Sequence, residues 1–555
     1  MGTVCCYASN KKKAFDLKIV DRSQSSGLGE EMLKQKIDFQ LQWEGSHSTI
    51  QDTQSVWKLA YNIGDQDINK FYDIQKNSSI GNGHYGTVHR CRLKTDPGKL
   101  YAVKSIEKNK LKGNLNILRN EFEILRSCDH PNINQFYEIF QDHKYFHFVL
   151  EYCEGGDITT RVEKYGAMDE SSAKVIIYQT LMAISHLHSC GIIHRDIKPD
   201  NFLFKNRGST WPIKLIDFGL SKKLPSNGKV TSFLGTPYYV APEILEKHPY
   251  DLKADSWSVG VMLYLILSAK FPFQGRSNQQ TFDMIKNKSY SMSASDGLIK
   301  LSLEGKNFMS KLLEKNPQKR LSIVEALRDP WFNELSISLI KRGRESFPKD
   351  VLQNLRSFSS ESTLVKEVIR LLVMIHDDTP EIARLKDAFF YLDALNLGIL
   401  NVDELRKAFS ESGMEIDDSE LHKILHSLEL RITNVLTFTE FASACVNKEF
   451  YTNKAYLTEV FNRFDVGHDG FISYSDISCC FSRFGVDLPR TEIMSIISDG
   501  DTDKDGRISF EEFVEVMSKD IHRSDLPPLR KVPDDAIDDD HKLHKGRFHS
   551  SQANK

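Results

Sequence analysis

The segment DTDKDGRISFEE, residues 501–512, places oxygen-bearing side chains at alternate positions and ends on two glutamates. Twelve-residue calcium loops take side-chain ligands at positions 1, 3 and 5, a backbone carbonyl at position 7 and a bidentate glutamate at position 12. In this segment those ligands are Asp501, Asp503, Asp505, the carbonyl of Arg507 and Glu512. Gly506 supplies the sharp turn at position 6, and Ser509 is placed to act through water. The segment therefore predicts a calcium site.

The same loop pattern recurs at a spacing of 36 residues. Earlier copies begin at Asp465, Glu429 and Asp393, and apolar residues at helical spacing flank them. A fixed period indicates repeated copies of one structural unit, here a helix–loop–helix hand. We therefore predict four hands in two pairs, with loops at 393–404, 429–440, 465–476 and 501–512.

The first two loops have lost calcium ligands. The first keeps Asp393, Gly398 and Glu404 but has leucine at positions 3 and 5, where calcium needs oxygen atoms. The second has Arg431 at position 3 and Asn434 in place of the glycine. A cation therefore points toward the metal position and the sharp turn is compromised. We predict that neither loop binds calcium.

The third loop is intermediate in its chemistry. Gly467 stands at position 3, and the shorter Asp476 replaces glutamate at position 12. Fewer carboxylates and a shorter bidentate ligand predict either weak calcium binding or a preference for magnesium. Its remaining ligands are Asp465, Asp469, the carbonyl of Phe471 and Asp476.

A second group of chemically active residues begins near position 80. The stretch IGNGHYGTVHR carries three glycines and a valine, Gly81, Gly83, Gly86 and Val88. It predicts two strands joined by a glycine turn, where backbone N–H groups can approach phosphates. Alone, the pattern also fits a plain hairpin or a dinucleotide-binding turn. Downstream, Lys104 in a strand and Glu121 in a helical segment are expected to pair, because a buried lysine needs a carboxylate.

Later motifs decide between these alternatives. HRDIKPDNFLF occupies residues 194–204, LIDFGLS residues 215–221 and GTPYYVAPE residues 235–243. The order of glycine loop, strand lysine, helix glutamate, HRDxxxxN, DFG and APE is similar to that of the protein kinases, over residues 72–332. Arg320 is the expected partner of Glu243.

The resemblance implies a phosphoryl-transfer site, where positioning and charge neutralisation do most of the work. Asp196 is expected to accept the proton of the substrate hydroxyl, and Lys198 to neutralise the γ-phosphate. Lys104 is expected to hold the α- and β-phosphates. Asn201 and Asp217 carry the hard oxygen ligands that Mg²⁺ prefers.

The resemblance also implies an ATP site and a substrate class. The expected ATP contacts are Gly81, Gly83, Gly86, Val88, Ala102, Lys104, the hinge residues Leu150, Glu151 and Cys153, and Asp157. Lys198 together with Thr236 is the serine/threonine form of the pattern. Asp157 and Asp200 predict substrates with basic residues near the phosphorylated serine, although Asp157 alternatively contacts the ribose. Ser232 is a predicted phosphorylation site whose phosphate would pair with Arg195.

Between the two chemistries lies a segment without ligands of either kind, residues 351–390. Its apolar residues recur at helical spacing, among them Leu355, Leu364, Val368, Leu372 and Ile375. The order of kinase, junction and four hands resembles the calcium-dependent protein kinases of plants and protists. In that family the junction blocks the kinase until calcium rearranges the hands around it. Alternatively, the segment is only a docking helix between domains.

Composition excludes several classes. The formal net charge is -3, so no basic excess indicates nucleic-acid binding. The nine cysteines form no CxxC pair, which predicts a reducing, cytosolic setting. The N-terminus, MGTVCCYASNKKK, resembles an acylation signal with Gly2 for myristate and Cys5 and Cys6 for palmitate, followed by three lysines. It predicts peripheral membrane attachment, with an ordinary N-terminus as the alternative.

The sequence thus predicts a multidomain α+β chain, in which a two-lobed protein kinase fold precedes an all-α domain of four EF-hands. The expected divisions are an extension at 1–70, a kinase at 71–332, a junction at 333–380, the hands at 381–520 and a disordered tail at 521–555. The expected function is a monomeric, calcium-regulated serine/threonine kinase that uses ATP, Mg²⁺ and Ca²⁺ on protein substrates. The alternative is a constitutive or weakly calcium-tuned kinase whose degenerate hands are mainly structural.

Overall fold

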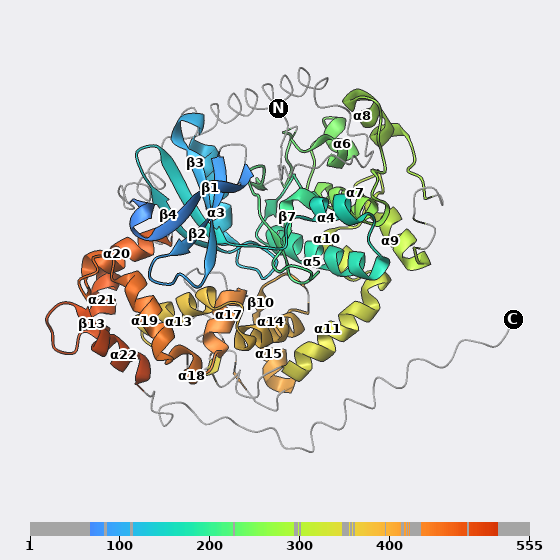
Figure 1. Ribbon diagram of the computed structural model, residues 1–555. Coiled ribbons are helices and arrows are strands. Elements are labelled where there is room, and N and C mark those ends of the chain that lie inside the picture. The colour runs from blue at the N-terminus through green and yellow to red at the C-terminus, as the bar shows by residue number, and fades with distance from the viewer. Residues whose placement is uncertain are drawn as a thin grey trace, which may run out of the picture.

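A computed structural model of the chain describes residues 67–519 with short gaps. These gaps are 83–85, 112–114, 226–227, 233, 293–297, 299–300, 347–353, 356–357, 359–360, 395, 412–415, 418, 420, 422–434 and 485–487. The predicted acylation residues Gly2, Cys5 and Cys6 and the predicted tail lie outside the described residues. Figure 1 shows a sheet-containing lobe, a helical lobe beside it, and further helices packed along both.

An antiparallel five-stranded sheet forms the first lobe. Its strands are β1 (Tyr72–Asn82), β2 (Gly86–Leu93), β3 (Leu100–Glu107), β4 (Phe136–Gln141) and β5 (Tyr145–Glu151), in the spatial order β1-β2-β3-β5-β4. Successive side chains of a strand point to opposite faces. Ala102 and Leu150 therefore pack on the face covered by helix α3 (Leu115–Ser127), while Tyr101 and Val149 pack on the other face.

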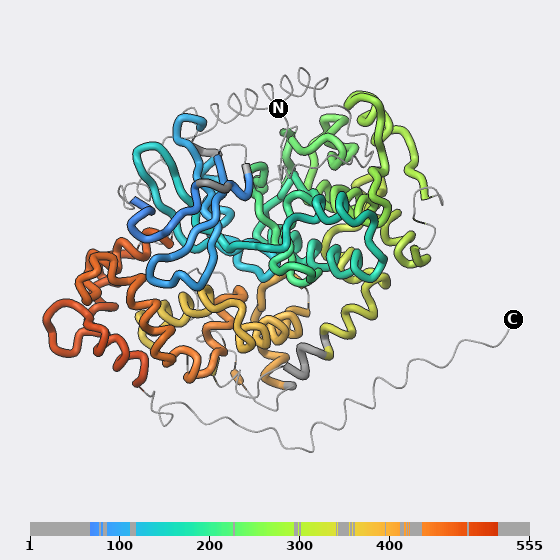
Figure 2. Tube along the Cα trace, viewed as in Figure 1, coloured from blue at the N-terminus to red at the C-terminus, as the bar shows by residue number. Residues whose placement is uncertain are grey.

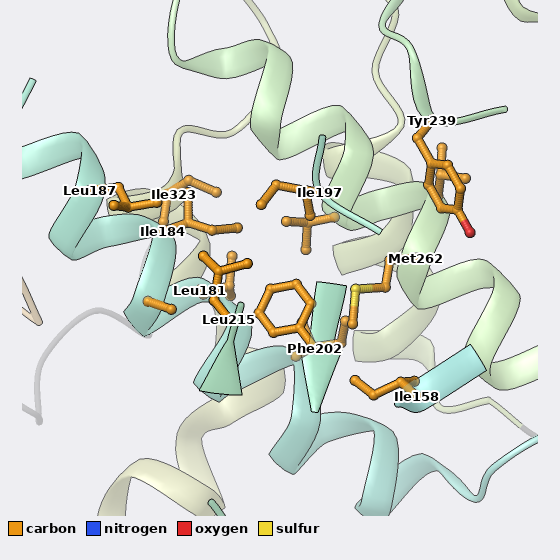
Figure 3. Packing of buried hydrophobic residues seen from close by; sticks show 14 of the residues in the cluster. Ile158, Leu181, Ile184, Leu187, Ile197, Phe202, Leu215, Tyr239, Met262 and Ile323 are labelled. Carbon is orange, nitrogen blue, oxygen red and sulfur yellow. The ribbon is translucent and has the colours of Figure 1, made fainter. Parts of the chain in front are cut away.

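The second lobe is mainly helical. Its helices are α4 (Ile158–Tyr165), α5 (Glu170–Ser189), α6 (Pro242–Leu245), α7 (Lys253–Ser268), α8 (Asn278–Asn287), α9 (Leu303–Leu312) and α10 (Ile323–Leu327). Short strands add β6 (Ile192–Ile193), β7 (Phe202–Phe204), β8 (Ile213–Leu215) and β9 (Lys222–Lys223). Figure 3 shows Leu181 and Ile184 of α5 and Met262 of α7 gathered around Ile197 and Phe202. This core supports the segment that carries Asp196.

Short 3-10 helices complete the two lobes. They are η1 (Ile68–Lys70), η2 (Lys108–Leu111), η3 (Pro199–Asn201), η4 (Pro237–Tyr239) and η7 (Pro330–Phe332).

Helices dominate the rest of the described chain. They are α11 (Asn333–Ser346), α13 (Thr363–Ile375), α14 (Pro380–Leu392), α15 (Val402–Glu411), α17 (Phe438–Cys445), α18 (Lys448–Tyr451), α19 (Lys454–Phe464), α20 (Tyr474–Arg483), α21 (Arg490–Gly500) and α22 (Phe510–Ser518). Four short strands are β10 (Leu400–Asn401), β11 (Val435–Leu436), β12 (Phe471–Ile472) and β13 (Ile508–Ser509). β10 pairs with β11 and β12 with β13, so the loops associate in two pairs. The predicted fold class is confirmed.

The junction helix α13 is enclosed by the hands. Its apolar stripe, including Leu364, Val368, Leu372 and Ile375, is buried in the same core as the helices of the hands. Helices α17, α19 and α21 all contact it. Figure 2 traces the chain from the blue sheet through the green lobe and back along α11 to these orange helices beneath the sheet. The amphipathic pattern of the junction therefore corresponds to packing inside the hands.

A buried charge cluster joins the third hand to the sheet. Arg463, at the end of α19, is 5% exposed and donates to Glu138 of β4 at 3.1 Å. Its other terminal nitrogen donates to the Tyr101 hydroxyl at 2.6 Å and to Glu459 at 3.3 Å. The third hand is therefore joined to the first lobe by buried hydrogen bonds.

Two broader features bear on the environment of the chain. The seven cysteines among the described residues are all free. Within the same residues, the helices are too short or too polar to cross a membrane.

Candidate active site and calcium loops

The HRD segment is anchored from below by a buried acid. The backbone N–H groups of His194 and Arg195 each donate to the Asp255 carboxylate at 2.9 Å, and Asp255 is fully buried in α7. Arg195 has a left-handed backbone with φ of 68°. Our sequence analysis missed Asp255, although an acid inside the apolar helix DSWSVG was a signal for such a role. Asp255 thus fixes the backbone that presents Asp196.

Asp196 lies at the centre of a hydrogen-bonded cluster. Its carboxylate accepts from Lys198 at 2.7 Å and from the Thr236 hydroxyl at 2.6 Å. The Asn201 amide donates to the backbone carbonyl of Asp196 at 2.7 Å. Burial opposes ionisation of Asp196, but Lys198 and Thr236 outweigh it and lower the pKa of its carboxyl. The carboxylate is therefore held ionised and oriented.

The strand lysine and the helix glutamate meet as expected. Lys104 of β3 forms a short ion pair with Glu121 of α3, and its amine lies 4.0 Å from Asp217. Burial opposes the lysine charge, but the two carboxylates outweigh it and raise the pKa of Lys104. Phe218 is buried and packs edge-on against His194 at 5.6 Å. The side chain of Asp217 remains 47% exposed, available to a ligand.

These residues can hold magnesium and the phosphates of ATP. Asn201 is bonded to Asp196, Asp217 lies 4.0 Å from the Lys104 amine, and each offers a side-chain oxygen for a metal, while Lys104 supplies a cation for phosphate. The residue types therefore fit the nucleotide and metal that the motifs predict.

The glycine strands have a packing reason as well as a chemical one. A Cβ on Gly86 would lie 1.9 Å from the Ser105 carbonyl of β3, so no other residue fits there. A Cβ on Gly81 would meet only Val88, at 3.8 Å. Val88 is opposite Lys104 in the β2–β3 register, and Gly83 lies outside the described residues. Gly86 thus lets β2 and β3 approach closely beside the site.

The hinge follows β5. Leu150 is paired with Ala102 across the sheet, and the Glu151 carbonyl accepts from the Asn134 amide at 3.0 Å. The same amide lies 3.7 Å from the Cys153 sulfur. A carbonyl has two lone pairs, so Glu151 can still accept a second bond from a ligand.

The Glu151 side chain accepts from the backbone N–H of Gln135 at 3.3 Å and also joins a network of charged side chains. Its carboxylate pairs with Lys205 and with Lys214, the latter at 2.7 Å. Lys205 also lies 3.9 Å from Asp377, which follows the junction helix. The network therefore connects the hinge to the linker before the first hand, a link that sequence reasoning did not anticipate.

Two acids proposed for substrate recognition have structural partners. Asp157 caps α4, accepting from the Thr160 N–H at 2.6 Å and the Thr160 hydroxyl at 2.7 Å. Burial raises the pKa of Asp200, and the nearby Asp157 charge adds to that rise. The two carboxyls therefore share one acidic region near Asn201.

Ser232 lies where a phosphate would meet a cation. Arg195 donates to the Ser232 hydroxyl at 2.6 Å and to the Leu220 carbonyl at 2.6 Å. The Tyr250 hydroxyl donates to the Ser232 carbonyl at 2.8 Å. The backbone of the activation segment is thereby held with Ser232 facing Arg195.

Glu243 and Arg320 are paired at the base of the second lobe. Their two hydrogen bonds measure 2.7 and 2.9 Å, and both residues are buried. This bidentate pair is the one expected from the sequence.

The fourth loop brings three carboxylates together. Oxygen atoms of Asp501, Asp503 and Glu512 lie within 4.8 Å of one another, the only such group of three acidic or metal-binding side chains within the described part of the chain. Gly506 has φ of 88° and donates to Asp501 at 2.8 Å. Burial disfavours the Glu512 charge, but hydrogen bonds, first from Ser509, outweigh it and lower its pKa to about 2. This loop fits calcium.

The rest of the fourth loop keeps the same turn. The Asp505 N–H donates to Asp501 and to Asp503, both at 3.1 Å, and Asp505 accepts from the Arg507 backbone at 2.8 Å.

The third loop has the same shape with one ligand missing. Asp465 accepts from the backbone of Asp469 at 3.2 Å and of Gly470 at 2.9 Å. A Cβ on Gly467 would lie 3.7 Å from an Asp476 oxygen and 4.0 Å from an Asp465 oxygen. Position 3 therefore faces the centre of the loop, where this chain supplies no side chain. Phe471, whose carbonyl is the predicted ligand at position 7, lies in β12.

The first loop holds its position 1 acid in a buried environment. Asp393 of the first loop is buried, and burial raises its pKa to about 7. Such a carboxyl is less suited to a cation than one held ionised. In the second loop, the predicted defects at Arg431 and Asn434 lie outside the described residues.

Comparisons with known proteins agree with these two chemistries. The protein kinase domain family matches residues 74–332, and the EF-hand domain pair family matches residues 454–518, which contain the third and fourth loops. Calcium-dependent protein kinase 7 of Arabidopsis thaliana is 32% identical over 458 residues, which cover 81% of this chain and 83% of the relative.

Similar relatives occur in other organisms. Calcium-dependent protein kinase 11 of Oryza sativa subsp. japonica is 32% identical over 480 residues, covering 85% of this chain and 81% of the relative. Calcium-dependent protein kinase 5 of Plasmodium falciparum (isolate 3D7) is 29% identical over 459 residues, covering 82% and 79%. The similarity therefore extends through both the two-lobed fold and the hands.

Proposed function

Because the chain belongs to the calcium-dependent protein kinase family, it is an ATP-dependent serine/threonine protein kinase regulated by calcium, and we propose residue roles for both activities. ATP supplies the phosphoryl group, and Mg²⁺ neutralises its developing charge. Asp196 orients the substrate hydroxyl and accepts its proton. Lys198 neutralises the γ-phosphate side of the site. Lys104, held by Glu121, contacts the α- and β-phosphates.

Magnesium and adenine are assigned to neighbouring groups. Asn201 and Asp217 hold the metal through their side-chain oxygens. The adenine ring lies against Leu150 and is hydrogen-bonded by the backbone of Glu151 and Cys153. The glycine strands, with Val88 and Ala102, enclose the nucleotide from above.

One observation carries the catalytic proposal. The Lys104–Glu121 ion pair, Asp217 at 4.0 Å from that lysine, and the 2.7 Å Lys198–Asp196 contact exist together in one arrangement. Kinase catalysis requires the strand lysine, helix glutamate and DFG aspartate to be in place at once. A chain that had abandoned phosphoryl transfer would have no reason to keep all of these contacts.

Calcium control is assigned to the second pair of hands. The fourth loop binds the ion through Asp501, Asp503, Asp505, the Arg507 carbonyl and Glu512, and the third loop binds more weakly. Ion binding reorganises helices of this pair, which contact the junction helix α13 through α19 and α21. We propose that calcium favours the arrangement in which the hands enclose α13.

Substrate choice and attachment are further parts of the proposal. Asp157 and Asp200 form an acidic region that favours substrates with basic residues near the target serine or threonine. Phosphorylation of Ser232 adds a pair with Arg195 and stiffens the activation segment. Acylation of Gly2, with Cys5 or Cys6, attaches a monomeric kinase to a membrane surface.

The activity is tested by peptide phosphorylation with the purified full chain, in calcium and in chelator. Wild type is expected to be faster in calcium, Asp196→Asn to be inactive in both buffers, and Asp501→Ala to lose most of the calcium response. Equal wild-type rates in the two buffers would favour the weakly tuned alternative, in which the degenerate hands are structural. No phosphate transfer in either buffer would refute the assignment of kinase activity.

A further inference from the structure

The first hand keeps the shape of a calcium loop although its ligand set is broken. The Asp393 carboxylate accepts from the backbone N–H groups of Leu397 at 2.9 Å and Gly398 at 2.7 Å. Asn401 and Glu404 exchange hydrogen bonds of 3.0 Å at the start of α15. The same backbone bonds shape the fourth loop at Gly506 and Ser509, so the first loop keeps its turn although leucines replace its ligands at positions 3 and 5.

The tip of this loop touches the second lobe. A Cβ on Gly398 would lie 2.5 Å from a ring carbon of His130 and 2.9 Å from a ring nitrogen of His186. The Tyr178 hydroxyl of α5 donates to the Asn396 side chain at 3.2 Å. Gly398 also has φ of 67°, a conformation that favours glycine. Only a glycine lets the loop backbone reach the two histidine rings.

Neighbouring elements of the first pair of hands extend the same contact. Thr439, in the first turn of α17, donates to the Asp129 carboxylate through its backbone N–H and its hydroxyl, both at 2.8 Å. Phe390 of α14 faces the His130 ring at 6.0 Å and packs against the cores of both domains. The contact thus combines a charged cap, a hydroxyl bond and apolar packing.

We propose that the first loop acts through residues 396–398 as a metal-independent dock, which holds the hands on the kinase surface formed by residues 129–130 and α5. Asp393 shapes the turn, and Gly398 admits the histidine rings. Neither role needs calcium. The first hand then anchors the domain while the third and fourth hands respond to the ion. The proposal concerns docking alone, so it stands or falls independently of catalysis.

Hydroxyl-radical footprinting of the full chain tests the dock, with oxidation of Tyr178 as the reporter because this side chain is 5% exposed. Gly398→Val introduces the clash at the histidine rings. Gly166→Val is the matched control, since Gly166 has φ of 80° but a Cβ there meets no atom within 4 Å. Asp129→Ala breaks the contact from the kinase side and leaves the hands intact.

Wild type and Gly166→Val are expected to protect Tyr178 equally in calcium and in chelator. Gly398→Val and Asp129→Ala are expected to raise its oxidation rate several-fold in both buffers. Loss of protection in wild type on chelation would overturn the proposal, because the dock would then need calcium. The proposal would also be overturned if Tyr178 stayed protected in both Gly398→Val and Asp129→Ala, or if its oxidation rose in Gly398→Val alone. In either case the contact between the loop and the kinase would not be what holds the hands in place.

Discussion

Replacing Arg463 by methionine removes the cation from the cluster that joins the third hand to the sheet. Methionine keeps much of the volume, so the main loss is electrostatic. Glu138 is 4% exposed and would keep a buried carboxylate without the guanidinium that lies 3.1 Å away. Breaking a buried pair by removing one partner costs about 3 to 5 kcal/mol. The Tyr101 hydroxyl also loses its donor at 2.6 Å.

Urea unfolding of the full chain, followed by circular dichroism, measures this loss. With an m-value of about 2.5 kcal/mol per molar, the midpoint is expected to fall by roughly 1 to 2 M. Because a multidomain chain need not unfold in two states, the comparison uses the transition that includes the hands. The double variant Arg463→Met/Glu138→Gln lacks the unpaired buried carboxylate, so it is expected to recover part of the lost stability.

Arg384→Ala provides the matched control for this experiment. Arg384 is 57% exposed and lies 3.9 Å from Glu381 on the same helix, a pair worth roughly 0.5 kcal/mol or less. A midpoint shift in Arg463→Met no larger than that in Arg384→Ala would refute the reasoning, since the buried pair would then contribute no more than a surface pair.

Three further outcomes are expected. Gly86→Ala, whose Cβ would clash at 1.9 Å, is expected to destabilise the fold and raise KM for ATP in kinetic assays, whereas Gly81→Ala, with 3.8 Å of room, is expected to have a smaller effect. Thr236→Val removes a bond that lowers the pKa of Asp196, so the acidic limb of the pH–kcat profile moves to higher pH, whereas Thr236→Ser preserves it. Burial raises the pKa of the Asp393 carboxyl to about 7 in the folded chain, against 3.8 when unperturbed, so between these pH values the group is protonated only in the folded state. The melting temperature of the wild type is therefore expected to fall as pH rises through this window, and Asp393→Asn is expected to lessen the fall.

Much of the catalytic site follows from the order of motifs in the sequence. Lys104 and Glu121 are 17 residues apart, and their contact could be predicted because a lysine in an apolar strand needs a carboxylate partner. The pairing of hands followed from the 36-residue period. Both predictions rest on patterns within one domain, where residue type and spacing largely determine which side chains meet.

The contacts between domains could not be predicted in this way. Arg463 and Glu138 are 325 residues apart, and a charged residue on a helix is usually solvated. Only the relative placement of two folded units brings them together. Gly398 shows the same limit, because its place in a calcium loop already accounts for a glycine and hides its contact with His130.

The hinge network has a consequence for the ionic environment. Lys205 and Lys214 enclose the buried Glu151 carboxylate, and Lys205 reaches toward Asp377, with the side chains of Lys205 and Asp377 17% and 14% exposed. Mobile ions screen exposed charges over a Debye length of about 8 Å at physiological salt, but they act weakly on buried ones. Exposed ion pairs on the helix surfaces should therefore weaken at lower salt concentrations than the ion pairs that join the hinge to the linker. The nucleotide site and the calcium-sensing domain thus share a connection that the solvent cannot readily tune.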